Sequence, residues 1–320
     1  MSLTMDTSLA PPWFEDLPVG TLFSGAPSLT LTEGHAALHQ AICGDRLRLA
    51  LERPLGEAVL GAGPPFAHPA LVWDVAIGQS TVATGRVIAN LFYRGLLLRR
   101  PVRLGDTLRT TTEVVARREN RSRPTGLAVL RIRTVDQEDR PVLDFSRCAM
   151  LPLRGEPTGD ARDEVGGAED LDHEDLVAAA AGYDLSALPE GGEVAEGELE
   201  GGDVVDSAPA LARLTLNVAM AHLDATRAAH GQRLVYGGHT IAIAAAQAAR
   251  AAPGLVTILG WHAADHTGPV FEGDTLRSAI AVERREPLPG RGELVHLRSH
   301  VTAVERDEPV LDWRFVGVLA

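Results

Sequence analysis

The chain has 320 residues, of which 45% are hydrophobic and 23% charged, a composition typical of a globular protein with a proper core. No apolar run approaches the ~18 residues of a membrane span. The first residues lack the basic and apolar stretches of a signal peptide, so we expect a cytoplasmic protein with no membrane partner. Two cysteines, Cys43 and Cys148, form no CxxC and no zinc-ligand spacing, so we expect neither a disulfide framework nor a metal site.

All 30 basic residues are arginine, and the absence of lysine limits the chemistry. It excludes Schiff-base catalysis, attachment of pyridoxal phosphate and a P-loop. The net charge is −13, but 17 acidic residues and one arginine lie between Glu156 and Asp206, so the remainder carries +3. That remainder can bind a phosphorylated ligand, but it lacks the clustered basic face that nucleic acid requires.

The chain repeats itself, and two separate motifs return with the same shift. Pro101–Glu119 returns as Pro269–Glu286 with GDTLR in common, and PVLDF at Pro141–Phe145 returns as PVLDW at Pro309–Trp313. This period is too long for a solenoid and indicates a duplicated domain. We expect an N-terminal module over residues 1–155, an acidic linker over 156–182 and a C-terminal module over 183–320.

Each module is expected to be an α+β unit, with one helix packed on an antiparallel sheet. In the first, a helix over Pro69–Thr81 precedes a strand over Gly126–Val135. In the second, an alanine-rich helix over His239–Ala252 precedes a strand over Leu294–Val304. The linker reads as a solvated acidic spacer with a short helix over Glu174–Ala181, and a regulatory docking segment is the alternative.

The segment Leu214–Gln247 holds the residues best suited to chemistry. Asn217 and His222 are five residues apart, which places an amide and an imidazole on one turn or loop, and Asp224 follows. The sequence YGGH at Tyr236–His239 then leads into a helix whose first N–H groups can bind an oxyanion. Each feature alone has an ordinary structural explanation. Together they suit a thioester reaction that passes through an enolate.

These residues resemble the motif of the MaoC-like hydratases, which have the hotdog fold. In that motif a histidine lies five residues after an aspartate, and an acidic residue follows two positions later. Asn217, His222 and Asp224 occupy these three positions, and Gly237-Gly238-His239 matches the family's His-Gly-Met helix start. Asn217 departs from the family by replacing the aspartate.

A narrower branch of the family, the mesaconyl-CoA hydratases or β-methylmalyl-CoA dehydratases, is more similar. Its pattern Asn-x-Ala-x-x-His-x-Asp-Ala-Thr matches residues 217–226, and its Tyr-Gly-Gly-His matches residues 236–239. Leu31–Gln40, Val87–Tyr93 and Arg147 after VLDF match as well. The resemblance therefore covers both modules.

The resemblance implies a double hotdog fold and reversible addition of water to the double bond of a 2-enoyl-CoA. In that reaction His222 acts as acid and base, Asn217 holds the water, and the N–H groups of Gly237 and Gly238 bind the thioester oxygen. The neighbours with supporting roles are Asp224, Tyr236 and His239. The implied partner is an acyl-CoA substrate, with no cofactor beyond its own coenzyme A, and assembly into a homo-oligomer is left open.

The first module is expected to be non-catalytic. Asp45 begins a motif-like segment, but Ala50 stands five residues later where a histidine is needed, and Pro69 has no N–H to offer. A hotdog acyl-thioesterase, an acyl-carrier dehydratase and a non-catalytic acyl-CoA-binding module are the alternatives. Thioesterases of this fold usually carry a carboxylate at the helix start, where this chain has Gly-Gly-His. The sequence does not identify the acyl group of the substrate. It also does not identify the arginine that would bind a distal carboxylate such as that of mesaconate.

Overall fold

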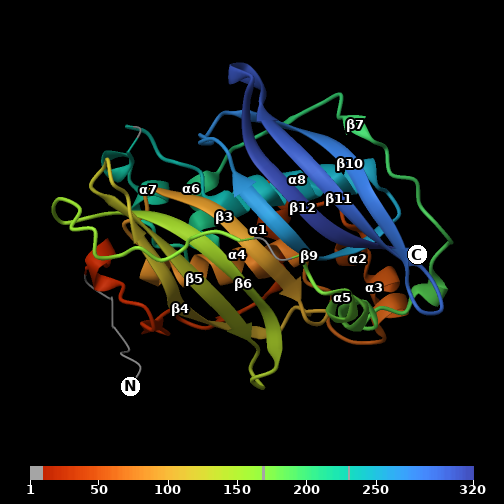
Figure 1. Cartoon of the computed structure of the whole chain (residues 1–320). Coiled ribbons are helices and arrows are strands. Elements are labelled where there is room, and N and C mark those ends of the chain that lie inside the picture. The colour runs from red at the N-terminus through yellow and green to blue at the C-terminus, as the bar shows by residue number, and fades with distance from the viewer. Residues whose placement is uncertain (1–9, 168–169, 230) are drawn as a thin grey trace.

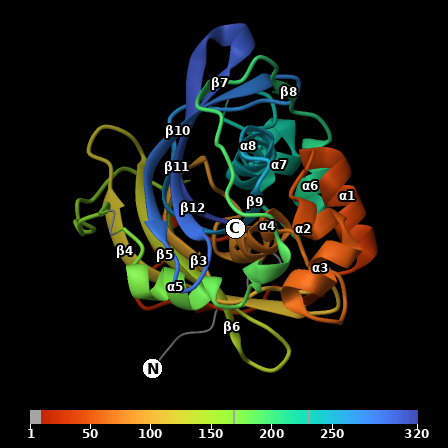
Figure 2. The same ribbon diagram turned by 90° about the vertical axis from the view of Figure 1, so that its right-hand side faces the viewer.

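The protein is described by a computed structural model over residues 10–167, 170–229 and 231–320. Within these residues twelve strands form one antiparallel sheet that curves around two long helices (Figure 1). The helices are α4 (Pro69–Ser80) and α8 (Gly237–Ala251). They lie next to each other on the concave side of the sheet, as Figure 2 shows in the view along them.

The strand order is β1-β4-β5-β6-β3-β9-β12-β11-β10-β7, with β2 beside β4 and β8 beside β10. The strands of the N-terminal half are β1 (Leu22–Phe23), β2 (Leu29–Thr30), β3 (Ala89–Leu98), β4 (Thr107–Glu119), β5 (Thr125–Val135) and β6 (Pro141–Pro152). Those of the C-terminal half are β7 (Gly197–Glu198), β8 (Asp203–Val204), β9 (Leu255–His266), β10 (Thr275–Pro287), β11 (Glu293–Ala303) and β12 (Glu308–Leu319).

Shorter helices cover the open side of α4 and α8 or connect the strands (Figure 2). The α-helices among them are α1 (Glu33–Cys43), α2 (Arg48–Leu51), α3 (Arg53–Leu60), α5 (His173–Ala180), α6 (Ala208–Leu214) and α7 (Met220–Leu223). The 3-10 turns are η1 (Phe14–Asp16), η2 (Thr81–Ala83), η3 (Leu185–Ala187), η4 (Ala225–Arg227) and η5 (Val304–Arg306).

Strands β3 and β9 join the two halves of the sheet, and one core runs beneath them. Phe92 of β3 pairs with Asp265 of β9 in an antiparallel ladder. Trp73 of α4 packs edge-on against Trp261 of β9 with ring centroids 4.9 Å apart, and against Trp313 of β12 at 6.3 Å. The three indoles are fully buried, so the helix of the N-terminal half packs directly on strands of the C-terminal half.

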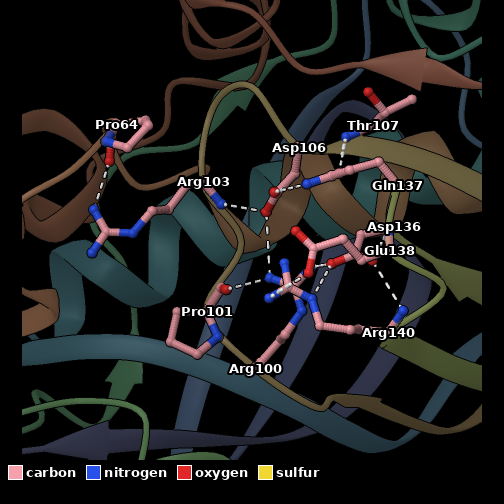
Figure 3. A network of polar contacts seen from close by, with 10 residues as sticks. All are labelled: Pro64, Arg100, Pro101, Arg103, Asp106, Thr107, Asp136, Gln137, Glu138 and Arg140. Carbon is pink, nitrogen blue, oxygen red and sulfur yellow. Dashed lines mark hydrogen bonds and ion pairs between the residues drawn. The ribbon is translucent and has the colours of Figure 1, made fainter.

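The repeated GDT motif has the same local structure in both halves. The carboxylate of Asp106 accepts a hydrogen bond from the backbone N–H of Arg103 at 3.1 Å (Figure 3). In the other half, Asp274 accepts one from the N–H of Phe271 at 2.8 Å. The following threonine N–H groups also have matching acceptors, Thr107 with Gln137 and Thr275 with Glu305, both at 2.9 Å. The motif therefore shapes the turn before β4 and before β10 and lies apart from the candidate site described below.

The predicted elements agree closely with the structure. Helix α4 begins at the predicted Pro69, whose ring suits the first helical position. Helix α8 begins at Gly237, two residues before the predicted His239, because both glycines belong to its first turn. The predicted strands correspond to β5 and β11, and the predicted linker helix to α5, with ends that differ by one residue.

The linker differs from the expected solvated spacer. The Trp313 side chain of β12 contacts Trp73 of α4, so the next side chain of that strand, Arg314, points to the opposite face of the sheet, near His262 of β9. There the Nδ1 atom of His262 accepts a hydrogen bond of 2.9 Å from the N–H of Leu171. Asp170 pairs with Arg314 at 3.1 Å, and α5 buries Leu176. This part of the linker is thus bound to the convex face of the sheet. No helix in the described part of the chain is long and apolar enough to cross a membrane.

Candidate active site

A cavity of about 200 Å³ lies between the two halves, at the N-terminal end of α8. Its walls come from α4, η2, β3 and β6 of the N-terminal half and from the 217–222 loop, α8 and the end of β9 of the C-terminal half. Four of the predicted site residues line it: Asn217, His222, Tyr236 and Gly237. The two halves thus build one site together, although the predicted residues all come from the second.

The loop that carries Asn217 is positioned by helix α4 of the other half. Gly78 has no side chain, and a Cβ atom there would overlap the carbonyl oxygen of Thr215. Because Gly78 has no Cβ atom, the loop that carries Asn217 can approach helix α4 closely. The hydroxyl of Thr81 then accepts a hydrogen bond of 2.9 Å from the N–H of Val218. The register between the loop and α4 is therefore set by direct contact across the halves.

The amide of Asn217 has one end engaged and one end free. Its Oδ1 atom accepts a hydrogen bond of 3.0 Å from the N–H of Ala219. Because that partner is a donor, the atom facing it must be the amide oxygen. The Nδ2 atom is buried in the cavity wall and has no hydrogen-bond partner among the described residues. Asn217 therefore presents N–H donors, which can hold the oxygen of a water molecule.

His222 lies on α7 with its two ring nitrogens in different roles. Nδ1 donates a hydrogen bond of 2.7 Å to the carbonyl oxygen of Leu234. This contact places the proton of the neutral ring on Nδ1 and leaves the lone pair on Nε2. Burial lowers the pKa of His222 to about 4 against the opposing effect of the Leu234 carbonyl, and the charge of Arg147 lowers it further. The His222 imidazole is therefore uncharged at physiological pH.

The first turn of α8 provides N–H groups at the cavity. The N–H groups of Gly237 and Gly238 have no preceding helical carbonyl to bind. A Cβ atom at Gly237 would overlap Nε2 of His266, and one at Gly238 would overlap Asp74 and the ring of Tyr236. Only glycine fits at both positions, so the positive end of the helix is free of side chains of its own and can receive an oxyanion.

His266 at the end of β9 is a cavity residue that the sequence reasoning missed. Its Nε2 atom lies against Gly237 and has no hydrogen-bond partner among the residues described. Burial lowers the pKa of His266 to about 4, so this imidazole is neutral as well. One feature of the sequence could have indicated His266. The internal repeat aligns it with the apolar Leu98, so the second half has a polar residue where the first half does not.

Arg147 of β6 is the second cavity residue whose role the sequence did not reveal. Its side chain is buried and lines the cavity opposite the C-terminal half. Burial lowers the pKa of this guanidinium, which still stays charged at any physiological pH. The sequence showed Arg147 only as part of a matching motif.

Gly238 and two of the predicted supporting residues, Asp224 and His239, lie outside the cavity lining. Asp224 is exposed and caps η4, where it accepts hydrogen bonds from the N–H and the hydroxyl of Thr226 at 2.9 and 2.7 Å. His239 is fully buried on α8, and neither ring nitrogen has a partner among the described residues. Burial and the charge of His39 lower the pKa of His239 to about 3.

The corresponding place in the N-terminal half is filled by the chain's own side chains. Gly44 turns the chain in the left-handed conformation before Asp45, as Leu216 does before Asn217. Asp45 is buried and contacts Nδ1 of His39 at 2.6 Å, and Nε2 of that ring contacts Asp74 at 3.0 Å. A buried ionic cluster thus occupies the position that is a cavity in the C-terminal half.

This cluster brings three potential metal ligands together, although the sequence predicted none. Ligand atoms of His39, Cys43 and Asp74 lie within 4.8 Å of one another. Burial alone would lower the pKa of His39, but Cys43, Asp45 and the bond to Asp74 raise it well above its usual value. Both ring nitrogens of His39 are engaged by the carboxylates of Asp45 and Asp74 in this arrangement.

Two curated relatives cover most of the chain. The β-methylmalyl-CoA dehydratase of Chloroflexus aurantiacus is 28% identical over 95% of this chain and 90% of its own length. The mesaconyl-CoA hydratase of Cereibacter sphaeroides is 29% identical over 88% of this chain and 87% of its own length. No family model matches the chain.

Two solved structures are similar over nearly the whole chain. A conserved hypothetical protein of Mycobacterium tuberculosis with a double hotdog fold is 46% identical, covers 97% of this chain and 98% of its own, and has a TM-score of 0.84. A Chloroflexus aurantiacus protein described as a MaoC domain dehydratase is 26% identical, covers 97% of each chain and has a TM-score of 0.81. The predicted α+β double hotdog fold is thereby confirmed. The chain is similar over nearly its whole length to proteins named as MaoC-like hydratases and dehydratases.

Proposed function

We propose that this protein is a hydro-lyase that adds water to, or removes it from, the double bond of a 2-enoyl-CoA. The observation that carries the proposal is the meeting, in one cavity, of a neutral imidazole with a free Nε2, a free amide and the N-terminus of a helix. These are a base, a water-binding donor and an oxyanion site. The curated relatives, which act on mesaconyl-CoA and β-methylmalyl-CoA, support the same class of reaction.

In the hydration direction, the Asn217 amide donates to the oxygen of a water molecule while Nε2 of His222 accepts one of its protons. The hydroxyl oxygen bonds to C3, and the electron pair of the C2–C3 double bond moves toward the thioester oxygen. The N–H groups of Gly237 and Gly238 stabilise the negative charge that gathers there. The imidazolium of His222 then returns its proton to C2, and the thioester carbonyl re-forms. Dehydration runs through the same steps in reverse.

The test is product analysis with crotonyl-CoA and mesaconyl-CoA. Formation of the 3-hydroxyacyl-CoA from either supports the proposal, and its loss in His222→Ala assigns the activity to this site. Release of free coenzyme A would instead identify a thioesterase. No turnover of either compound, with binding retained, would favour the non-catalytic acyl-CoA-binding alternative.

A branched dicarboxylic acyl group such as mesaconyl or β-methylmalyl is the proposed substrate within this class. A cytoplasmic location is also proposed, and it is supported by two cysteines that are both buried and unpaired, which suits a reducing compartment. Assembly into a homo-oligomer completes the proposal, and sedimentation of the full chain tests it.

A further inference from the structure

Arg147 is a buried cation without a counter-ion among the residues that the structure describes. Its side chain is 2% exposed. Nη2 donates to the carbonyl oxygen of Ser80 at 3.2 Å and to the hydroxyl of Thr84 at 2.7 Å, and Nη1 donates to Oδ1 of Asn90 at 3.4 Å. All three acceptors are neutral. The Nε atom is buried and has no partner among the described residues.

Other arginines of the sheet form ion pairs with acidic side chains. Arg94 of β3 pairs with Asp265 at 2.6 Å, and Arg298 of β11 pairs with Asp312 at 2.6 Å. Within the described residues, no aspartate or glutamate forms an ion pair with Arg147. Removing a charge from water without such a partner is strongly unfavourable, so a site of this kind is usually completed by a ligand of opposite charge.

Arg147 also shares the cavity with the proposed reacting groups. Arg147 and His222 line the same cavity, and the positive charge of Arg147 lowers the pKa of the His222 ring. Asn90 and Thr84, which hold the guanidinium, line the cavity as well. An anion that reaches Arg147 must therefore enter the cavity in which the thioester would react.

We propose that Arg147 binds a carboxylate at the far end of the substrate's acyl chain and so selects dicarboxylic acyl-CoA thioesters. This inference rests on the proposed function. One N–H of Nη1 remains for that carboxylate, because the contacts with Ser80, Thr84 and Asn90 use the other Nη donors and hold the guanidinium in place. Pairing with the ligand completes the ion pair that the folded chain lacks, and a substrate with a methyl group at that position leaves the charge unpaired.

The matched substrates are mesaconyl-CoA and tiglyl-CoA, which differ only by a carboxylate in place of a terminal methyl group. The wild-type preference is measured as the ratio of their kcat/KM values, and Arg147→Gln is expected to lower it by about 30-fold or more. Arg298→Gln is the matched control, since it removes an arginine that already has an acidic partner, and it should leave the ratio unchanged. Equal losses for both substrates would overturn the proposal, because Arg147 would then act at the thioester oxygen or only in folding.

Binding provides a readout that does not depend on turnover. In the His222→Ala background, calorimetry should show tighter binding of mesaconyl-CoA than of tiglyl-CoA, and Arg147→Gln should remove the difference. A protein that hydrates neither compound but keeps this preference refutes the proposed function and leaves the carboxylate site standing. A protein that hydrates tiglyl-CoA as well as mesaconyl-CoA supports the proposed function and refutes the carboxylate site.

A second variant covers the case in which Arg147→Gln fails to fold. Asn90→Asp places a carboxylate of the chain itself beside Nη1 of Arg147 with almost no change in volume. It should pair the guanidinium internally and abolish the preference for mesaconyl-CoA. Retention of the full preference in folded Asn90→Asp would contradict the proposal.

Discussion

The hydrogen bond from Nδ1 of His222 to the carbonyl oxygen of Leu234, 2.7 Å long, decides which nitrogen of the ring faces the cavity as a base. Histidine alone, with an ordinary pKa near ~6.5, would be partly protonated at neutral pH. Burial and the charge of Arg147 lower the pKa to about 4 despite the Leu234 bond. The tautomer and the charge state of the proposed base are therefore both set by its surroundings.

The first prediction concerns the pH dependence of hydration. A base with a lowered pKa stays unprotonated until the solution becomes acidic, so kcat/KM should be flat through neutrality and fall as the pH drops toward 4. His222→Gln should lose about 100- to 10,000-fold in kcat/KM and lose this acidic limb. An acidic limb that persists unchanged in His222→Gln would assign the ionisation to another group, with His266 the nearest candidate in the cavity.

Asn217 is expected to act as a hydrogen-bond donor and to take no part in proton transfer. Asn217→Ala removes the free amide and also the acceptor for Ala219, so kcat/KM should fall by about 100-fold or more. Asn217→Asp keeps that acceptor and supplies a carboxylate that can bind the water, so its loss should be smaller. Steady-state kinetics on the same enoyl-CoA rank the variants. A greater loss in Asn217→Asp than in Asn217→Ala would contradict the assignment.

His266 is predicted to contribute to turnover because its Nε2 atom, which has no partner among the described residues, lies beside Gly237, whose N–H is proposed to bind the oxyanion. Replacement by leucine, the residue at the corresponding place in the other half, keeps a side chain of similar size and removes the imidazole. We expect a loss of about 100-fold in kcat with the unfolding temperature little changed. Unchanged kcat in a folded His266→Leu would make this residue part of the packing alone.

Gly78→Ala tests whether α4 positions the loop that carries Asn217. A methyl group at this position must push the loop away from the helix, since it would overlap the carbonyl oxygen of Thr215. We expect a loss of about 1–3 kcal/mol in stability and a fall in kcat/KM larger than stability alone explains. Gly34→Ala in α1 is the control, because a Cβ there meets only Thr32 at 3.6 Å. Thermal unfolding and kinetics are measured for both, and equal behaviour would contradict the prediction.

Asp45 shows how the structure changes an expectation from the sequence. The sequence assigns Asp45 to a module expected to be non-catalytic, but in the structure this residue is 2% exposed and its carboxylate contacts the buried ring of His39. Asp45→Ala should therefore destabilise the fold by about 3 kcal/mol or more, as breaking a buried ion pair does. The kcat/KM of the protein that remains folded should change only a few-fold, because Asp45 is not in the cavity lining. Urea unfolding and kinetics at low temperature separate the two effects.

The local signals in the sequence were sufficient for most of the fold. The return of GDTLR and PVLD at one spacing, a proline at the start of α4 and alternation in β5 and β11 are properties of short segments, so they can be read without knowing what each segment packs against. The same holds for the loop with Asn217 and His222. The linker was misjudged for the opposite reason. Its acidic composition suggests solvation, while its contacts with His262 and Arg314 depend on a sheet built from distant strands.

The sequence by itself determined that the chain is duplicated, where its two central helices lie, and that only the second half combines an amide, an imidazole and a glycine-rich helix start. Only the tertiary structure decided that the cavity also uses the first half and that His266 lies beside the helix start. It also decided that Arg147 is a buried cation with no counter-ion in the described part of the chain. The physical reason is that the burial of a side chain and its ion pairs depend on the residues around it as well as on its own type. Both arise when strands β3 and β9 bring together segments that lie far apart in the chain.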